Sequence, residues 1–272
     1  MIAVIDPTEA APEPEPMLDE VVQQLQKTVS ASRLSLYLSC RLKFFFRYVV
    51  GLKKPKSAAL HVGSAVHSAL KAWNKARWRD QPLTLKELHD QFTKAWADAE
   101  EPVKWEDDDE SEQQSTAWKL IEIYTRQANP TAKPEFVEVP VESDLHEHGL
   151  PKLVGILDLV QAGKIIDYKT SGQTPNAEKV AHTNEVQTSI YAMLYRENTG
   201  KRENGIELHH LVKLKTPKVV ITELPPMSEN QQSRLFSLIE SYGHGLDRRD
   251  FVPAPGLQCA ACEFFNECRA WH

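Results

Sequence analysis

Three short segments in the second half of the chain carry apolar residues in alternation with polar ones or in unbroken runs. Segments of this kind are typical of β-strands, and we expect strands at 135–145, 153–160 and 164–170. The connections at 148–149 and 162–163 each end in glycine, a residue that suits a tight turn. The pattern therefore predicts that the three strands form an antiparallel meander.

Apolar residues spaced three or four positions apart predict helices on either side of this meander. One helix is expected to begin at the N-cap Ser30 and to continue without a break through Phe46. The other predicted helices cover 18–29, a stretch from Gly63 through Trp73, 84–99, 112–127, 185–198 and 228–246. Two more strands are expected at 209–215 and 219–224. This order of elements predicts an α/β or α+β fold with a mixed sheet.

The chain has 272 residues, enough for one elaborated domain or two small ones. Its first sixteen residues are rich in Pro, Glu and Ala, so we expect 1–29 to be an acidic, mostly disordered tail. A single domain would then cover 30–272, divided into a helical region at 30–130, a catalytic sheet core at 131–226 and a C-terminal helix with cysteines at 227–272. No segment has the roughly 20 consecutive apolar residues of a membrane span, and the N-terminus lacks the features of a signal peptide. We therefore expect a cytoplasmic protein with no membrane association.

The formal net charge of −6 is unusual for a protein that binds nucleic acid, but the charges are unevenly distributed. Acidic residues are concentrated in 1–26 and 106–112. Residues 30–60 contain no acidic side chain, and their basic ones are Arg33, Arg41, Lys43, Arg47, Lys53, Lys54 and Lys56. Such a stretch can form a face that binds phosphates, or it can be an ordinary solvated helix surface. Charge alone favours neither interpretation.

Two aspartates and a lysine on neighbouring predicted strands are candidates for catalysis. Asp167 and Lys169 are two residues apart and therefore share a face, and Asp158 can lie beside Asp167. Mg²⁺ or Mn²⁺ would relieve the repulsion between the two carboxylates, and Lys169 could act on the attacking water or on the scissile phosphate. Solvated side chains on an ordinary strand pair are the alternative, but the apolar strands around these aspartates favour a functional site. Glu138, on the preceding strand, is a weaker candidate, and Glu142 is weaker still.

The four cysteines fall into two groups, with Cys259, Cys262 and Cys268 near the end and Cys40 far upstream. Cytosolic thiols stay reduced, so metal ligation is a better explanation than disulfide bonding. Four thiolates can hold zinc or a [4Fe–4S] cluster, and the spacing does not separate the two. Buried inert cysteines are the other possibility, although none of the four is left over.

Taken together, these residues resemble the PD-(D/E)XK nuclease superfamily, in particular its RecB-like exonuclease branch. Five features match in order: the helix with His67, the strand Gly155–Asp158, the strand Asp167–Lys169, the helix with Gln187 and Tyr191, and the flanking cysteines. The match extends from Ser30 to Cys268. It implies an α/β, restriction-endonuclease-like fold, in which helices flank a central mixed sheet, with an N-terminal helical region and a C-terminal cluster-binding segment.

The resemblance also implies roles for individual residues. His67, Asp158 and Asp167 would hold Mg²⁺ or Mn²⁺ with the backbone carbonyl of Tyr168, and Lys169 would be the catalytic lysine. Gln187 and Tyr191 lie on one helix face and would position DNA or the catalytic groups; simple packing of an amphipathic helix is the alternative. In the RecB-like branch, one upstream cysteine with a C-terminal triplet is the iron–sulfur version, found in AddB-type and CRISPR-associated nucleases. The resemblance therefore favours a [4Fe–4S] cluster on Cys40, Cys259, Cys262 and Cys268, with zinc as the alternative.

The combined prediction is a metal-dependent DNA nuclease, a single-strand-preferring exonuclease of recombination, repair, or CRISPR or phage DNA processing. The basic residues expected to guide DNA are Arg33, Arg41, Lys43 and Arg47, with Tyr37 or a tryptophan as stacking partner. The chain has no Gly-x₄-Gly-Lys-Ser/Thr motif, so helicase activity would need a partner protein. The alternatives are an inactive nucleic-acid-binding or scaffolding module and a zinc-stabilised structural subunit. No motif predicts the oligomeric state.

Overall fold

The protein is described here from a computed structural model that covers residues 15–98, 101–106, 108–128 and 132–271. The disorder predicted for residues 1–14 lies outside these described residues. Over 15–29 the structure differs from the predicted tail and confirms the helix predicted over 18–29. This segment forms the helix α1 (Glu15–Lys27) and the short strand β1 (Thr28–Val29), and Val22 and Leu25 are buried in the main core.

A six-stranded mixed sheet forms the centre of the molecule. Its longer strands are β4 (Phe136–Ser143), β5 (Lys152–Gln161), β6 (Lys164–Ser171), β7 (Ile206–Val212) and β8 (Lys218–Leu224). Strands β4, β5 and β6 pair antiparallel, which confirms the predicted meander, whereas β6 and β7 are parallel. The chain makes this parallel connection through two helices, α7 (Ala177–Thr183) and α8 (Glu185–Thr199). The predicted mixed sheet is therefore confirmed.

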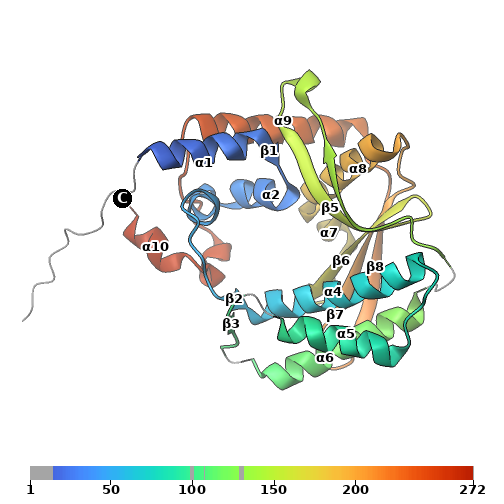
Figure 1. Cartoon of the computed structure of the whole chain (residues 1–272). Helices are drawn as coiled ribbons and strands as arrows, with labels where there is room; N and C mark the ends of the chain where they lie inside the picture. The colour runs from blue at the N-terminus through green and yellow to red at the C-terminus, as the bar shows by residue number, and fades with distance from the viewer. Residues whose placement is uncertain (1–14, 99–100, 107, 129–131, 272) are drawn as a thin grey trace, which may run out of the picture.

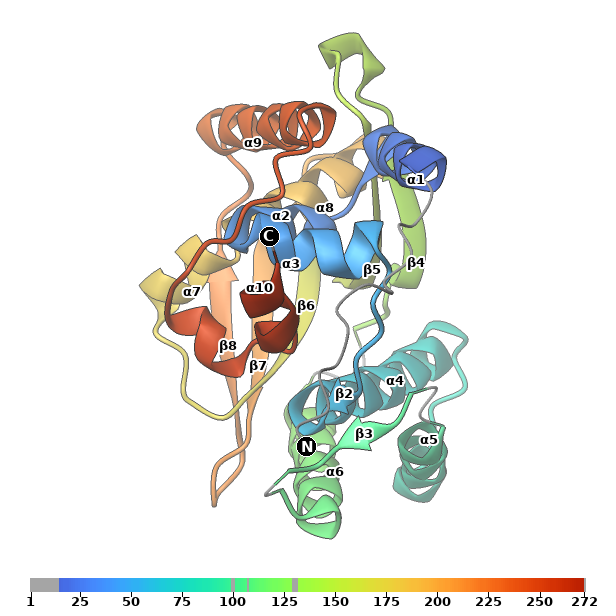
Figure 2. The same ribbon diagram turned by 90° about the vertical axis from the view of Figure 1, so that its left-hand side faces the viewer.

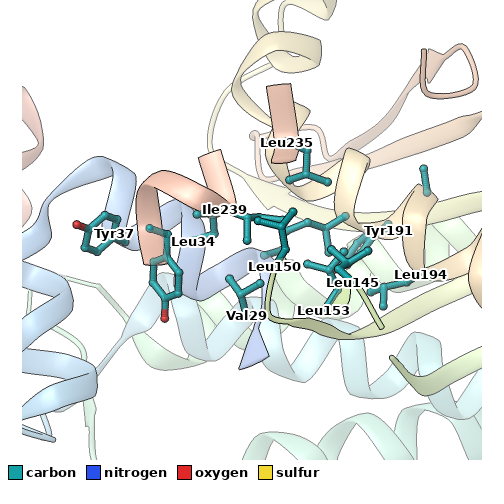
Figure 3. Packing of buried hydrophobic residues seen from close by; sticks show 14 of the residues in the cluster. Val29, Leu34, Tyr37, Leu145, Leu150, Leu153, Tyr191, Leu194, Leu235 and Ile239 are labelled. Carbon is teal, nitrogen blue, oxygen red and sulfur yellow. The ribbon is translucent and has the colours of Figure 1, made fainter. Parts of the chain in front are cut away.

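Helices cover both faces of the sheet, as Figure 1 shows. One face carries α4 (Ala58–Trp78), α5 (Leu85–Ala97) and α6 (Glu110–Gln127), and the other carries α1, α2 (Ala31–Ser39), α8 and α9 (Glu229–Asp247). Each layer has its own core of buried side chains. In the main core, which lies under α1, α2, α8 and α9, side chains from α2, β5, α8 and α9 pack together. Figure 3 shows among them Leu34, Leu153, Leu194 and Ile239.

The helix starts follow local capping chemistry. Thr84 and Ser228 each form a reciprocal capping box with the residue three positions on, which satisfies backbone N–H groups that lack a partner within the helix. Ser57 caps α4 in the same way by accepting a hydrogen bond from the backbone of Leu60. This helix therefore begins several residues before Gly63, where the apolar spacing had placed its start.

The helix predicted to continue unbroken from Ser30 to Phe46 is interrupted at Cys40, so that prediction is wrong. Cys40 has an extended backbone (φ −163°, ψ 109°), and a short helix α3 (Arg41–Phe44) and a π-helical turn η1 (Phe45–Val49) follow it. The interruption separates two packing surfaces. Phe44 stays in the main core, whereas Phe46 packs against Phe264 of the C-terminal segment.

The remaining elements are short. They are β2 (Lys56–Ser57), β3 (Val103–Lys104), and the helical turns η2 (His146–His148), η3 (Leu257–Ala261) and α10 (Phe265–Ala270). Figure 2 shows α10 close to α3, while β2 and β3 lie at the start of α4. Within the described residues, no helix is both long and apolar enough to cross a membrane.

Candidate active site

Strands β5 and β6 separate at the position of the two predicted catalytic aspartates. Their pairing runs from the turn up to Leu159 and Ile166 and stops there. Beyond this point the Oδ2 atom of Asp158, and not a β5 carbonyl, accepts a hydrogen bond from the backbone N–H of Tyr168 at 3.1 Å. The carboxylate thus satisfies a buried backbone donor and opens the sheet locally.

Asp167 lies at this opening and is 2% exposed. Its Oδ1 accepts a hydrogen bond from Gln187 Nε2 at 3.0 Å, and its Oδ2 lies 2.8 Å from Lys169 Nζ. Lys169 and Oδ2 thus form an ion pair, and Oδ2 is a buried atom without a hydrogen bond. Burial raises the pKa of Asp167, and the charge of Asp158 adds to this, while Lys169 partly opposes it. The negative charge of the ionised form is therefore incompletely compensated by the protein.

Gln187 connects the charged groups to helix α8. Its Oε1 accepts a hydrogen bond from Lys169 Nζ at 2.6 Å, and its Nε2 donates to Tyr191 Oη at 2.9 Å as well as to Asp167. The Tyr191 side chain reaches into the main core (Figure 3), and burial followed by the charge of Asp167 raises its pKa. The phenol therefore stays protonated, and it anchors the Gln187 amide.

His67 reaches the opening from α4 on the other face of the sheet. Its Nε2 hydrogen-bonds the carbonyl oxygen of Tyr168 at 2.9 Å, and its Nδ1 lies 3.4 Å from Asp158 Oδ2. Burial lowers the pKa of His67, but the hydrogen bond and charge of Asp158 outweigh it, so the pKa is raised overall. The close approach of α4 depends on Gly63, where a Cβ would lie 3.2 Å from Thr170 Oγ1.

The structure thus brings together all the residues predicted to bind a divalent cation or to assist catalysis. Asp158, Asp167, Tyr168 and His67 offer two carboxylates, a carbonyl and an imidazole, a donor set that suits Mg²⁺ or Mn²⁺. The unbonded Oδ2 of Asp167 fits such a role. Across the described residues, however, no group of three or more His, Cys, Asp or Glu side chains is already gathered to hold a metal ion. Instead, His67 contacts Asp158 and Lys169 contacts Asp167, the two carboxylates that a bound cation would contact.

The opening leads into a cleft of about 530 Å³. Helix α2, the strands β4 and β5, and helix α8 supply its walls, with Ser30, Ala31, Ser32, Ser35, Glu138, Gly155, Ile156, Asp158, Gln187 and Tyr191 as lining residues. Gly155 lets β5 pack closely against α8, because a Cβ there would lie 2.7 Å from Leu194 Cδ1. Asp158, Gln187 and Tyr191 are therefore reachable from this cleft.

The four cysteines come together between α3 and the C-terminal segment. All four are half-buried and free of disulfides, and Cys40, Cys262 and Cys268 pack against the apolar cluster of Leu42, Phe46 and Phe264. Burial raises the pKa of Cys268, and charge on the neighbouring Cys40, Cys262 and Cys259 side chains would raise it further. The four thiols are therefore neighbours, although the absence of a gathered metal-binding group among the described residues holds for them as well. Zinc and iron–sulfur clusters are the ligands that such side chains can bind.

Ion pairs link the predicted DNA-binding residues to the C-terminal segment. Arg41 pairs with Asp250, and both Lys43 and Arg47 pair with Glu263. Lys54 pairs with Glu267 in the same region. These contacts bind the N-terminal helices to the cysteine-bearing end of the chain, a role that the sequence does not indicate.

The other groups predicted to contact DNA have different surroundings. Arg33 donates to Thr28 Oγ1 at 2.8 Å and is half-buried. Tyr37 is 1% exposed and packs against Phe44 and Tyr242, so its ring is not available for stacking on a base.

A second polar layer lies behind the site and has no counterpart in the sequence analysis. Tyr168 Oη accepts a hydrogen bond from Asn74 Nδ2 at 2.9 Å, and Tyr124 Oη contacts His209 Nδ1 at 2.9 Å. His209 Nε2 lies 2.8 Å from Glu207 Oε2. The layer holds the side chain of Tyr168, whose carbonyl faces the site.

Comparisons with known proteins agree with this arrangement. A family model described as the PD-(D/E)XK nuclease superfamily matches residues 28–269. No curated protein matches the chain in sequence. Among solved structures, the chain is similar to a crystal structure from Eubacterium rectale named "Putative exonuclease", with a TM-score of 0.60 and 16% identity over 92% of this chain and 90% of that chain. At this identity the likeness shows the fold alone, a mixed sheet flanked by helices.

Proposed function

Because the chain belongs to the PD-(D/E)XK nuclease superfamily, we propose that it is a metal-dependent deoxyribonuclease that degrades single-stranded DNA from an end. The observation that carries this proposal is the buried Oδ2 of Asp167, which has no hydrogen bond although it lies beside Asp158 and Lys169. A buried unsatisfied carboxylate oxygen is costly in a purely structural role, and it is explained if the oxygen binds a cation during catalysis.

The residues that would hold Mg²⁺ or Mn²⁺ are Asp158, Asp167, His67 and the carbonyl of Tyr168. When bound, such an ion supplies a Lewis acid that polarises a phosphoryl oxygen and lowers the pKa of water. Lys169 orients the attacking water or neutralises charge that develops on the scissile phosphate. Gln187 keeps the Lys169 ammonium in place through its 2.6 Å hydrogen bond, and Tyr191 fixes the amide of Gln187.

We further propose that Cys40, Cys259, Cys262 and Cys268 hold a [4Fe–4S] cluster with a structural role, with zinc as the alternative. The packing of Cys40, Cys262 and Cys268 around one small apolar cluster supports a shared ligand. Near the cysteines, the last segment of the chain is held by the small apolar cluster, by half-buried ion pairs and by a backbone hydrogen bond from Leu42 to Val252. These contacts are few, so a bound cluster would add much to its attachment.

The basic side chains of α2, α3 and η1 are the proposed path for DNA. Lys43 and Arg47 share the single carboxylate of Glu263, so this group keeps a net positive charge that can attract phosphates. Arg33 and Arg41 would extend the path, although Arg41 must share its charge with Asp250. We also propose that the protein works with a helicase or recombination partner. Its role would be in repair, CRISPR adaptation or phage DNA processing.

The test is degradation of end-labelled single-stranded DNA with Mn²⁺ or Mg²⁺ by anaerobically purified protein. We expect Asp167→Ala and Lys169→Ala to abolish cleavage and the exposed control Asp144→Ala to cleave like wild type. Iron, sulfide and zinc analysis of the same preparation distinguishes a cluster from zinc. If cluster-loaded wild type binds DNA without cutting it, the inactive binding module replaces the nuclease proposal.

A further inference from the structure

Glu138 disturbs strand β4 directly opposite Asp158. Its backbone has a φ of +43°, in the left-handed region that side chains other than glycine rarely adopt. The antiparallel pairs Val137 with Leu159 and Val139 with Leu157 are formed on either side, but Glu138 and Asp158 do not pair. Asp158 therefore lies where β5 is unpaired toward both neighbouring strands, since β6 has already diverged.

Ordinary sheet irregularities do not explain this conformation. The pairs on the two sides are in the same register, so no extra residue is inserted, as it would be in a β-bulge. Glu138 is not at a turn either, because β4 continues through Ser143. A left-handed residue inside a strand destabilises the fold and persists where the surroundings impose it, most often at functional sites.

The side chain of Glu138 belongs to the cleft described above. It lines this cleft together with Asp158, Gln187 and Tyr191. It forms an ion pair with Lys71, which lies one helical turn after His67 on α4 and therefore on the same face of that helix. The carboxylate is the more buried partner, with 19% of its side chain exposed against 39% for Lys71.

The ion pair resembles a second one at the site, because Asp167 Oδ2 lies 2.8 Å from Lys169 Nζ. Asp158 also has a basic side chain beside it, since the imidazole of His67 lies 3.4 Å away. Each carboxylate at the opening thus has a basic side chain of the protein as its neighbour. The buried Oδ2 of Asp167 has no hydrogen bond, which is an independent sign that the charge there is incompletely compensated.

We infer that Glu138 is a third carboxylate of the cation site, with Lys71 as its counter-ion until a divalent cation binds. The inference rests on the proposed function, because it assumes that Asp158 and Asp167 bind a divalent cation. It also explains the strained backbone, since the left-handed conformation at Glu138 lets its carboxylate line the cleft beside Asp158. Lys71 would then be left on α4 without its carboxylate partner.

A structural ion pair between α4 and β4 is the competing explanation, and Glu142 provides a matched control. Glu142 lies on the same strand and pairs with Lys152 at 2.9 Å, but its side chain is 64% exposed. It has no positive φ. Removing its charge therefore changes a comparable pair on β4 without touching the cleft.

The test is Mn²⁺ binding by isothermal titration calorimetry, with urea unfolding of each variant to confirm the fold. We expect Glu138→Gln to lower Mn²⁺ affinity about tenfold and Glu142→Gln to leave it unchanged, since a charged ligand is lost only in the first. Glu138→Gly relaxes the strained backbone. It should therefore unfold at higher urea than Glu138→Gln, while binding Mn²⁺ equally weakly.

Asp167→Asn separates failure of this inference from failure of the proposed function. If Asp167→Asn loses Mn²⁺ binding while Glu138→Gln and Glu138→Gly both keep wild-type affinity, Glu138 is only a structural partner of Lys71. If wild type itself binds no Mn²⁺, the proposed nuclease site is wrong and the inference falls with it. A tenfold loss in both Glu138 variants with an unaffected Glu142→Gln establishes the third carboxylate.

Discussion

Replacing Asp167 by asparagine should make the protein more stable while it abolishes cleavage. Asp167 is almost fully buried, and its Oδ2 has no hydrogen bond. Burial raises the pKa of this carboxyl above its ordinary value, so the group favours the fold when protonated and loses that contribution as the pH rises through the folded pKa. Ionisation of this carboxyl therefore weakens the fold.

The size of the effect follows from the uncompensated oxygen. A buried polar atom without a hydrogen bond costs about 1–3 kcal/mol, and loss of the contact with Lys169 offsets part of the gain from removing it. Asparagine keeps an oxygen that can accept the hydrogen bond from Gln187 Nε2. We therefore expect the free energy of unfolding to rise by about 1–2 kcal/mol.

Asp158 should respond in the opposite direction, which makes it a demanding control. Its carboxylate accepts the backbone N–H of Tyr168 and faces His67, so the protein compensates its charge well. A hydrogen bond to a charged acceptor is stronger than one to a neutral amide. Asp158→Asn should therefore lower the free energy of unfolding by about 1 kcal/mol, although it too abolishes cleavage.

The assay is urea unfolding at pH 7 without added divalent ions, followed by the same measurement with Mn²⁺. Wild type should gain stability from Mn²⁺, and neither variant should gain as much, because a ligand that binds only the folded state stabilises it. If Asp167→Asn unfolds at lower urea than wild type, Lys169 and Gln187 compensate the carboxylate fully. The argument from its unbonded oxygen would then be refuted.

Three other predictions concern the surroundings of the site. Gln187→Leu should reduce kcat on single-stranded DNA about 100-fold with little change in KM, because the Lys169 ammonium loses its acceptor. Hydrogen bonding from His209 lowers the pKa of Glu207 from 4.5 to about 2. Its contribution is present above the unfolded value and lost toward pH 2, so Glu207→Gln should unfold more easily by about 1–2 kcal/mol at pH 7, and this difference should vanish near pH 2 in urea titrations. In Gly245→Ala the new Cβ would lie 1.6 Å from the oxygen of a buried tyrosine. Although alanine favours helix more than glycine does, the free energy of unfolding should fall by at least about 2 kcal/mol in the same measurement.

The fold was predictable wherever periodicity and capping agree. The meander follows from alternation around β4, β5 and β6. Helix α5 begins where the helix over 84–99 was predicted to begin, because Thr84 and Glu87 satisfy each other locally. The interruption at Cys40 was not predictable, because helical propensity favours continuation on both sides of it. The break serves a tertiary purpose, since it allows Phe46 to pack against Phe264 more than two hundred residues later.

The site was predictable in its residues but less so in their charge partners. The order of His67, Asp158, Asp167 and Lys169 along the chain indicated a common site, and the structure brings these residues together. The ion pairs of the basic N-terminal helices were not predictable, because Glu263 lies far along the chain in a segment whose position depends on the whole fold. The left-handed backbone at Glu138 has no sequence signal at all, since glutamate is not a residue that favours it.

The cationic partners of the site carboxylates have a consequence for the reaction. Three carboxylates around one opening would repel one another, and His67, Lys169 and Lys71 limit this repulsion in the protein itself. A divalent cation that binds the carboxylates would take over this compensation. Lys169 and Lys71 would then lose their carboxylate partners, whereas His67 is itself a proposed ligand of the cation. A phosphate that reaches the opening would then meet positive charge that was previously engaged. On this view metal binding and phosphate binding reinforce each other, because both depend on the same exchange of partners at the opening between β5 and β6.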